Sequence, residues 1–346
     1  MKKLKSLQLI ESGQRNSTID IFRAIAIISV VLFHFNNFLP YGHVGVDLFF
    51  VISGLLIGGL LIHDIGEGKQ IRFFRFILQR GFKIWPSYYS FIIVGNIAAY
   101  FLFSTIAPDQ YIPLWDIKRY IFFYQNYTGQ PFHWSFDHVW SLCVEEHFYI
   151  MLPILFIVIQ RSYNDRRVLL VAVCLVIVAG ILFKYLALIY TNSKDTYSGT
   201  HNRIDALAWG VLLSIIINFY PKLMKRISFV IGLLLFIAAM WMEINLESVI
   251  YHKVIFHSFL PICFFLMISG LYDFDFSRLK WLRLIAYYSY NWYLWHPIFA
   301  ISINYLFGNT TTGLLVYAVS SFVTAIIFTV IVEEPFLEMR KKVIPG

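Results

Sequence analysis

Ten apolar runs, each close to the length that crosses a lipid bilayer, recur along this chain of 346 residues. A transmembrane helix needs about 20 predominantly apolar residues, and its backbone must satisfy its own hydrogen bonds because lipid offers none. The runs lie at 19–39, 44–63, 87–105, 142–160, 168–190, 203–220, 227–242, 252–272, 283–305 and 313–333. The pattern predicts an all-α integral membrane protein, a bundle of about ten transmembrane helices.

The composition supports a membrane protein and argues against two other classes. Hydrophobic residues make up 59% of the chain and charged residues 14%, which leaves too little polar surface for a soluble fold. The net charge is +8, but the basic residues form short clusters between apolar runs, so we expect no nucleic-acid partner. The three cysteines, Cys143, Cys174 and Cys263, are far apart and lack CxxC spacing, so we expect neither a disulfide framework nor a metal site.

Lysine and arginine are distributed unequally between the segments that join the runs. If the N-terminus is cytoplasmic, the cytoplasmic segments hold most of these residues and the outer segments hold few. This bias predicts an even number of spans with both termini in the cytoplasm. We therefore expect a cytoplasmic N-terminal segment at 1–18, a transmembrane domain at 19–334, a basic cytoplasmic tail at 335–346, and no appended soluble domain or cleaved signal peptide.

The first apolar run, IDIFRAIAIISVVLFHF, contains two residues that are costly in hydrocarbon, Arg23 and His34. At about 100° and 1.5 Å per residue, their spacing puts both side chains on one stripe, about 16 Å apart along the helix axis. Ionisable residues inside a membrane normally face a protein interior or a watered cavity. The spacing predicts one lined face that runs from the cytoplasmic side into the membrane. Alternatively, Arg23 could extend to the inner headgroups and His34 could pack between helices.

Polar and ionisable residues gather where three other runs begin on the predicted outer side. The segments are GHVGVDLFFVISGLL with Asp47 and Ser53, VWSLCVEEHFYIMLP with Trp140, Ser141, Glu145 and Glu146, and NRIDALAWG with Arg203 and Asp205. Adjacent carboxylates point in different directions on a helix, so we expect one glutamate to face inward and the other to face water. Each cluster alone is typical of an interfacial ion pair. Together they predict an acidic and basic chamber above His34.

The segment RFFRFILQRGFKIWPSYY, on the predicted cytoplasmic side, interleaves basic and aromatic residues. Arg80 and Lys83 are three positions apart at a helix start and would face the same way, and Arg75 precedes them. Arginine and lysine suit phosphate groups, which favours a site for a phosphate-bearing cytosolic ligand. Ordinary positive-inside anchoring is the alternative. The sequence has no Walker loop and no GxGxxG motif, so a nucleotide site of those types is not expected.

With these motifs in view, the chain resembles the membrane-bound acyltransferase 3 family, the bacterial integral-membrane O-acyltransferases that modify surface polysaccharides. The likeness covers nearly the whole chain and includes the arginine–ten residues–histidine spacing, WSLxVEE, QRGFKIWP, NRIDALAWG, YSYNWYLWHP and EEPFLEMRKK. The resemblance implies transfer of an acyl group, usually acetyl, from the donor substrate acyl-CoA to a hydroxyl of a cell-surface or lipid-linked glycan, with no permanently bound cofactor. It also implies a multi-pass protein of the bacterial inner (cytoplasmic) membrane, in contact with membrane lipids.

The resemblance assigns roles to two pairs of residues. It implies that Arg23 and His34 are essential, with His34 acting as a general base or as a transient acyl carrier. Arg80 and Lys83 correspond to the family's basic pair between the second and third spans, where a second arginine is more usual. Lysine lacks the planar fork of arginine, which weakens the case for bidentate phosphate binding at that position.

Other motif residues receive weaker assignments. One of the two glutamates, Glu145 or Glu146, would orient the histidine or the acceptor. We expect His296, in YLWHP, to line the cavity or to pack between helices rather than to react. Cys143 stands at the variable position of WSLxVEE, and we infer no cysteine nucleophile.

Without the resemblance, the residues leave a second function open. Ten spans with buried arginine, histidine and carboxylates would also suit a proton-coupled transporter or a glycan-lipid flippase. Against that function, the sequence has no visible inverted repeat and no matching pair of Gly/Pro-broken spans. A non-catalytic scaffold is a third alternative, but it has little use for ionisable residues within its spans.

Overall fold

The computed structural model describes residues 15–104, 107–128, 133–162, 165–190 and 197–344. These residues form a helical bundle and contain no β-strand. The helices that follow the predicted runs are α2 (Ser17–His34), α3 (Gly45–Gly66), α4 (Phe73–Ser90) continued by η2 (Phe91–Gly95) and α5 (Asn96–Phe103), α7 (Trp140–Ser162), α8 (Arg166–Tyr190), α9 (Ile204–Phe219), α10 (Ile227–Asn245), η8 (Tyr251–Ile255) continued by α11 (Phe256–Leu271), α12 (Lys280–Phe307), and α13 (Thr311–Phe328) continued by η9 (Thr329–Glu333) and α14 (Glu334–Val343).

The predicted fold class, an all-α membrane bundle, is confirmed. Within the described residues, eight helical segments are long and apolar enough to cross a membrane by length and composition. The other two predicted spans correspond to α9, a shorter apolar helix, and to α12, which has 28 residues. Polar residues of α12, among them Arg283, Asn291 and His296, are buried inside the bundle. The predicted total of about ten crossings is therefore reached only if α9 and α12 also span the membrane.

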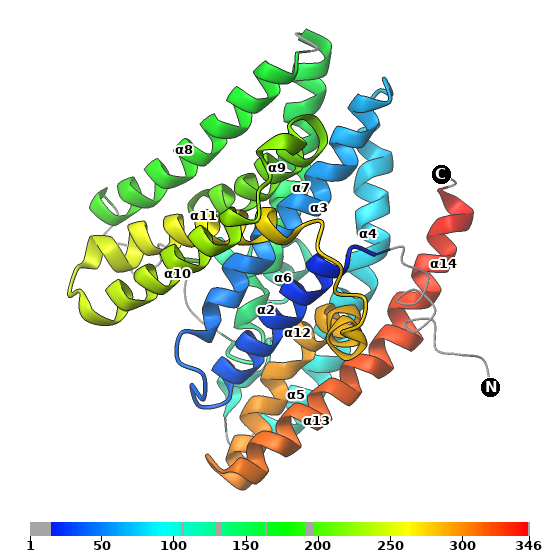
Figure 1. The fold of residues 1–346 in the computed structure, drawn as a ribbon. Helices are drawn as coiled ribbons and strands as arrows, with labels where there is room; N and C mark the ends of the chain where they lie inside the picture. The colour runs from blue at the N-terminus through cyan, green and yellow to red at the C-terminus, as the bar shows by residue number, and fades with distance from the viewer. Residues whose placement is uncertain (1–14, 105–106, 129–132, 163–164, 191–196, 345–346) are drawn as a thin grey trace.

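Helix packing divides the bundle into a centre and two flanks (Figure 1). The helices α3 and α9 cross at the centre, and α2 packs between α3 and α12. On one flank α10 packs against α11, and on the other α12 packs against α13. Exposed apolar side chains recur at helical spacing on the outer surfaces of the flanks, for example Leu234, Ile237 and Trp241 on α10. Such a surface suits contact with lipid.

The close crossing of α3 and α9 depends on two glycines that face each other. A Cβ atom on Gly54 would lie 1.9 Å from the carbonyl oxygen of Leu207, and one on Gly210 would lie 2.0 Å from the carbonyl oxygen of Val51. Real Cβ atoms do not approach backbone oxygens so closely. Small residues at such a crossing let two backbones touch, which is how membrane helices gain packing energy where lipid gives no hydrophobic drive.

Two helix boundaries differ from the predicted ones for local reasons. The first helix ends at His34, five residues before the predicted end at 39, because Asn36 and Asn37 adopt left-handed backbone conformations that a helix cannot contain. The inner connection predicted at 64–86 is mostly helical, since α4 begins at Phe73. These shifts place His34 at the end of its helix and Arg80 in the middle of its own.

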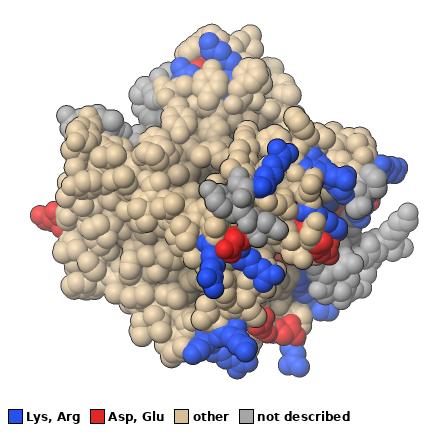
Figure 2. Space-filling view, turned by 90° about the horizontal axis from the view of Figure 1, so that it is seen from above, with Lys and Arg blue, Asp and Glu red and all other residues tan. Residues whose placement is uncertain are grey.

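The predicted basic tail at 335–346 is ordered as helix over most of its length. Residues Glu334–Val343 form α14, which continues α13 through the π-helical turn η9 and packs against α4. Figure 2 views the molecule from the top of Figure 1, the predicted cytoplasmic face, and Lys and Arg side chains gather over one part of it. The tail therefore adds its cations to the same face as the cations of α4.

Candidate functional site

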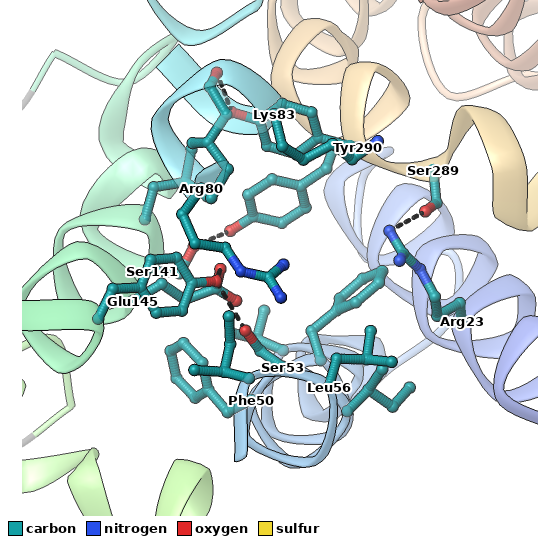
Figure 3. A pocket seen from close by; sticks show the side chains of 18 residues that line it. Arg23, Phe50, Ser53, Leu56, Arg80, Lys83, Ser141, Glu145, Ser289 and Tyr290 are labelled. Carbon is teal, nitrogen blue, oxygen red and sulfur yellow. Dashed lines mark hydrogen bonds between the residues drawn. The ribbon is translucent and has the colours of Figure 1, made fainter. Parts of the chain in front are cut away.

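A cavity lies inside the bundle between α2, α3, α4, α7 and α12. We call it the inner cavity (Figure 3). Its polar lining residues come from every one of these helices and are Arg23, Ser53, Arg80, Lys83, Ser141, Glu145, Tyr149, Ser289, Tyr290 and Tyr293. Three cations and one carboxylate thus face one space, which suits an anionic or polarised ligand.

Arg23 reaches the inner cavity from α2. Its Nη2 donates a hydrogen bond to Ser289 Oγ on α12 at 3.1 Å. Its Nε is buried and has no hydrogen-bond partner among the described residues. Figure 3 shows the guanidinium groups of Arg23 and Arg80 pointing into the cavity from opposite sides. The guanidinium therefore lines the cavity, with Nη2 held by Ser289.

Glu145 is held in a hydrogen-bonded chain that joins α7 to α3. The Tyr149 hydroxyl donates to Glu145 Oε2 at 2.5 Å and lies 2.8 Å from Ser53 Oγ. Tyr149 follows Glu145 by four positions, so both side chains lie on one face of α7. The chain fixes the carboxylate at the cavity wall.

Glu146 points away from the inner cavity. It is buried, and it accepts a hydrogen bond from the Trp85 indole nitrogen at 3.1 Å. The expectation that one glutamate faces inward is met by Glu145, but the other faces α4 rather than water. The WSLxVEE motif thus supplies one cavity carboxylate, not two.

Arg80 lines both the inner cavity and a second opening at the predicted cytoplasmic face. This opening, which we call the mouth, is lined by Arg80, Leu60, Gln79, Arg340, Lys341 and Ile344. Lys83 lines the inner cavity and forms an ion pair with Glu333 of η9. Arg75, a further predicted donor-binding residue, lines neither space. The structure therefore brings Arg80 and Lys83 together, as predicted, and adds two cations from α14.

His34 does not line the inner cavity. It lines a separate outer pocket with Asp109, Gln110, Trp134, Pro297, Ala300 and Ile301. The single lined face expected to run from Arg23 to His34 is thus divided into two spaces. The His34 Nδ1 atom lies 2.9 Å from the Val30 carbonyl oxygen, so Nδ1 carries the proton and Nε2 holds a lone pair. That tautomer leaves Nε2 able to act as a base.

His296 lies between the two spaces and lines neither. It is fully buried, and its ring contacts the His34 ring edge-on with centroids 4.8 Å apart. Tyr293, one turn earlier on α12, reaches the inner cavity, where its hydroxyl lies 2.7 Å from Ser141 Oγ. Aromatic side chains of α12 therefore separate His34 from Arg23.

The chamber expected from Asp47, Arg203 and Asp205 is a packed ionic cluster. Arg203 Nη2 lies 2.6 Å from Asp47 Oδ1, and Lys184 Nζ lies 2.6 Å from Asp205 Oδ2, with all four side chains buried. The Arg203 guanidinium also lies over the ring of Trp140. Buried charges that are paired in this way neutralise each other. None of these residues lines the inner cavity or the outer pocket.

Sequence reasoning missed several lining residues. Tyr149 could have been found, because it stands one helical turn after Glu145 on the same face. Arg340 and Lys341 were placed in a tail, and the proximity of α14 to α4 has no mark in local sequence. Ser289 and Tyr293 precede His296 by about two turns and one turn of α12, a relation visible only once the facing helices are known.

A family model and several curated relatives match this chain, and the family model covers nearly all of it. Residues 16–334 match the family model of an acyltransferase domain. "O-acetyltransferase OatA" of Staphylococcus aureus strain NCTC 8325 is 24% identical over 351 residues, which cover 94% of this chain and 57% of the relative. "Putative O-acetyltransferase SAS0844" of strain MSSA476 is 28% identical over 255 residues, which cover 68% of this chain and 42% of the relative. The chain thus spans about half the length of these relatives, and no solved structure matches it.

Proposed function

Because the chain belongs to the acyltransferase 3 family, whose domain model matches residues 16–334, we propose that it is an O-acetyltransferase that moves an acetyl group from acyl-CoA to a hydroxyl of a glycan. This proposal rests on the presence of two spaces in one helical bundle, the inner cavity and the outer pocket. The inner cavity adjoins a cationic mouth on one face, and the outer pocket carries a histidine with a basic nitrogen. The protein is a multi-pass membrane protein, and we propose the bacterial cytoplasmic membrane as its location.

The mouth and the inner cavity fit the two halves of the donor. The phosphates of acyl-CoA cannot enter hydrocarbon, but Arg80, Arg340 and Lys341 offer them charged hydrogen-bond donors at the mouth. The slender, mostly apolar pantetheine arm would then pass Arg80 into the inner cavity. Arg80 is the residue that lines both spaces, so we propose that the arm passes beside its side chain.

Inside the cavity, the thioester carbonyl would meet positive charge. Attack on the carbonyl carbon places negative charge on its oxygen, and a fixed guanidinium in a water-poor space stabilises that charge more than water does. Arg23 lines the inner cavity, where only its Nη2 has a hydrogen-bond partner among the described residues. We assign this role to Arg23, and to Glu145 the role of holding the cationic side chains in place through charge.

On the outer side, His34 would take the proton of the acceptor hydroxyl on Nε2. The pocket around His34 includes Trp134, whose side chain is 57% exposed. Exposed aromatic rings of this kind stack on sugar faces. We therefore place the glycan acceptor at the outer pocket, with its hydroxyl toward His34, and propose that the α12 side chains between the two spaces move aside during transfer, so that this hydroxyl reaches the thioester carbon.

The test is acetyl transfer by purified protein in lipid nanodiscs, supplied with radiolabelled acetyl-CoA and crude cell-wall glycan from Staphylococcus aureus. Free CoA and labelled glycan are measured for the wild type, His34→Ala and Arg23→Gln. We expect both products from the wild type and loss of both in either variant. His147→Gln, a change on α7 away from both spaces, serves as the matched control and should keep activity. Equal activity of His34→Ala and wild type would contradict the role of His34, and no product from the wild type would favour a carrier.

A further inference from the structure

An apolar slot lies between α7, α8 and α9, apart from the inner cavity and the outer pocket. All its lining side chains are apolar, and they include Met151 and Leu155 of α7, Val173 and Val176 of α8, and Ala208 and Val211 of α9. We call it the lateral slot. Its volume is about 160 Å³. Apolar cavities of about 150 Å³ stay free of water and take up a molecule as large as benzene, so the lateral slot has room for a segment of hydrocarbon chain.

The lateral slot adjoins the lipid-facing surface of the bundle. Met151, one of its lining residues, is 52% exposed, and Ile154 of α7 and Leu175 of α8 are exposed apolar side chains nearby in the chain. Figure 1 shows α8 diverging from α7 as it leaves their joined ends at the top. In a membrane, hydrocarbon is what can fill an apolar space at this depth, and an unfilled one loses van der Waals contacts.

A second space lies at the predicted cytoplasmic ends of α3, α7, α8 and α9, and we call it the end pocket. Ile159 of α7, Leu169 of α8 and Phe219 of α9 line it. On α7, Ile159 stands one turn after Leu155 of the lateral slot, and on α8, Leu169 stands one turn before Val173. The end pocket therefore continues the line of the lateral slot toward the level of the lipid headgroups.

Arg166 is the cation that lines the end pocket. Its guanidinium carbon lies 4.4 Å from the centroid of the Phe219 ring. Stacking of this kind engages the flat face of the guanidinium, so the N–H groups at its edge can donate to an anion. Arg166 thus offers phosphate a planar set of donors at the cytoplasmic end of the apolar slot.

The other two polar side chains that line the end pocket, Gln160 and Asp165, hold backbone groups. Gln160 Nε2 donates to the Lys69 carbonyl oxygen at 2.8 Å, and Asp165 Oδ1 accepts from the Arg167 backbone nitrogen at 2.8 Å. The stretch from Arg161 to Arg167 carries three arginines against one aspartate. This net positive charge beside an apolar slot complements an anionic lipid headgroup.

We propose that the end pocket and the lateral slot together bind one anionic phospholipid of the cytoplasmic leaflet, with its phosphate at Arg166 and one acyl chain in the slot. Val173 and Val176 are seven and ten positions after Arg166, which is about 10 and 15 Å along the axis of α8. The hydrocarbon of one leaflet is about 15 Å thick, half of the bilayer core. An acyl chain that starts at Arg166 therefore reaches the slot.

The bound lipid would contact the helix that carries Glu145. Met151 and Leu155 line the lateral slot, while Glu145 and Tyr149 line the inner cavity from another face of α7. Arg166 lines neither the inner cavity nor the mouth. The lipid would therefore support α7 between its neighbours without entering the spaces assigned to the donor.

Native mass spectrometry of the purified protein in detergent tests the site. Phosphatidylglycerol and phosphatidylcholine with the same acyl chains are titrated into the protein, and we expect phosphatidylglycerol to bind the wild type at least about fivefold more tightly. Arg166→Gln should weaken phosphatidylglycerol binding by about fivefold, the contribution of one cation beside an anionic lipid. Arg167→Gln is the matched control, because the next residue points about 100° away around the helix, and it should stay within about twofold of wild type.

A second pair of variants tests the slot. Val176→Phe places a ring in the lateral slot and should also weaken phosphatidylglycerol binding, by at least about threefold for a chain that loses a few buried methylene groups. Val178→Phe, at a position of α8 that is 59% exposed and lines neither space, should bind as wild type does. Glycerol phosphate, which has the phosphate but no acyl chain, should not displace the lipid.

Equal binding of the two lipids by the wild type would overturn the proposal, and this outcome does not depend on the folding of any variant. Equal losses in Arg166→Gln and Arg167→Gln would also overturn it, because the attraction would then belong to the charged surface as a whole. Displacement of phosphatidylglycerol by glycerol phosphate, or equal behaviour of Val176→Phe and Val178→Phe, would exclude the acyl chain from the lateral slot and so overturn the site as proposed.

Discussion

Lys83 of α4 forms an ion pair with Glu333 of η9 inside the bundle, so one of the two cations expected to bind donor phosphate is already held by a carboxylate. Glu333 Oε2 also accepts a hydrogen bond from Asn291 of α12 at 2.9 Å. The pair ties α4 to the turn that leads into α14. We therefore assign Lys83 a structural role. Arg80 is the α4 cation that lines both the inner cavity and the mouth.

Removal of Lys83 should therefore destabilise the protein. In Lys83→Met, Glu333 would remain buried without its cation. Because Lys83 is itself partly exposed and Asn291 still donates to Glu333, the cost should fall below the about 3–5 kcal/mol of a fully buried pair. Thermal unfolding in detergent should show a clear fall in the midpoint. The double variant Lys83→Met/Glu333→Gln should recover most of that loss, because no uncompensated charge is left. A single variant as stable as wild type would contradict the structural role.

Arg340 and Lys341 should affect only donors that carry the nucleotide. In Arg340→Ala/Lys341→Ala, the KM for acetyl-CoA should rise by about tenfold or more, since each charge-assisted hydrogen bond contributes about 1.5–3 kcal/mol. The KM for acetyl-pantetheine, which lacks the nucleotide phosphates, should not change. Lys342→Ala, an exposed lysine of α14 that lines neither space, is the control. An equal effect on both donors would place the change outside phosphate binding.

Substitutions at Glu145 and Glu146 should have very different effects on the acetyl-transfer rate, although the two residues are adjacent in sequence. Glu145→Gln removes the carboxylate that faces Arg23 and Arg80 in the inner cavity, and we expect a fall of about a hundredfold in kcat, typical for loss of a positioned charged group. Glu146→Gln retains an acceptor for the Trp85 indole and should stay within about threefold of wild type. Acetyl-transfer rates at saturating acetyl-CoA decide the matter, and the reverse order would contradict the assigned cavity.

The glycine contact between α3 and α9 gives a stability prediction. Gly54→Ala would force a Cβ against the Leu207 carbonyl oxygen, and the overpacking should cost about 1–3 kcal/mol or more. Gly59→Ala, on the same helix, meets only the Ser214 hydroxyl oxygen at 3.4 Å and should be tolerated. Unfolding midpoints of the two variants should differ by several degrees. If both behave alike, the crossing does not depend on Gly54.

The sequence was a good guide to the helices and a poorer one to how they divide space. The length of an apolar run and the charge bias beside it are local properties of the sequence, so they predict helix positions well. The run predicted at 44–63 is α3 at 45–66, and the run predicted at 203–220 is α9 at 204–219. The pairing of Asp205 with Lys184 required knowing that α8 packs on α9. No pattern within either segment records that contact.

The sequence indicated which residues line the inner cavity better than it indicated how the spaces in the bundle are divided. Arg23, Arg80, Lys83 and Glu145 do share one cavity, because each stands on a helix face that turns inward. His34 shares a stripe with Arg23 on α2 but not a cavity. The stripe sets only the direction in which His34 points. The two spaces are separated by His296 and its neighbours on α12, and His296 lies 262 positions after His34 in the chain.

The rings that separate the two spaces also bear on how such a protein can remain in an energised membrane. A cavity open toward one face and a pocket open toward the other would, if joined, form an aqueous pore that dissipates ion gradients. His296 and the edge-to-face pair of Phe91 and Trp295, whose ring centroids are 5.3 Å apart, are buried in the stretch where such a pore would form. The same partition that hides His34 from Arg23 acts as a permeability barrier, and variants that shrink these rings are expected to make cells leak protons before they lose acetylation.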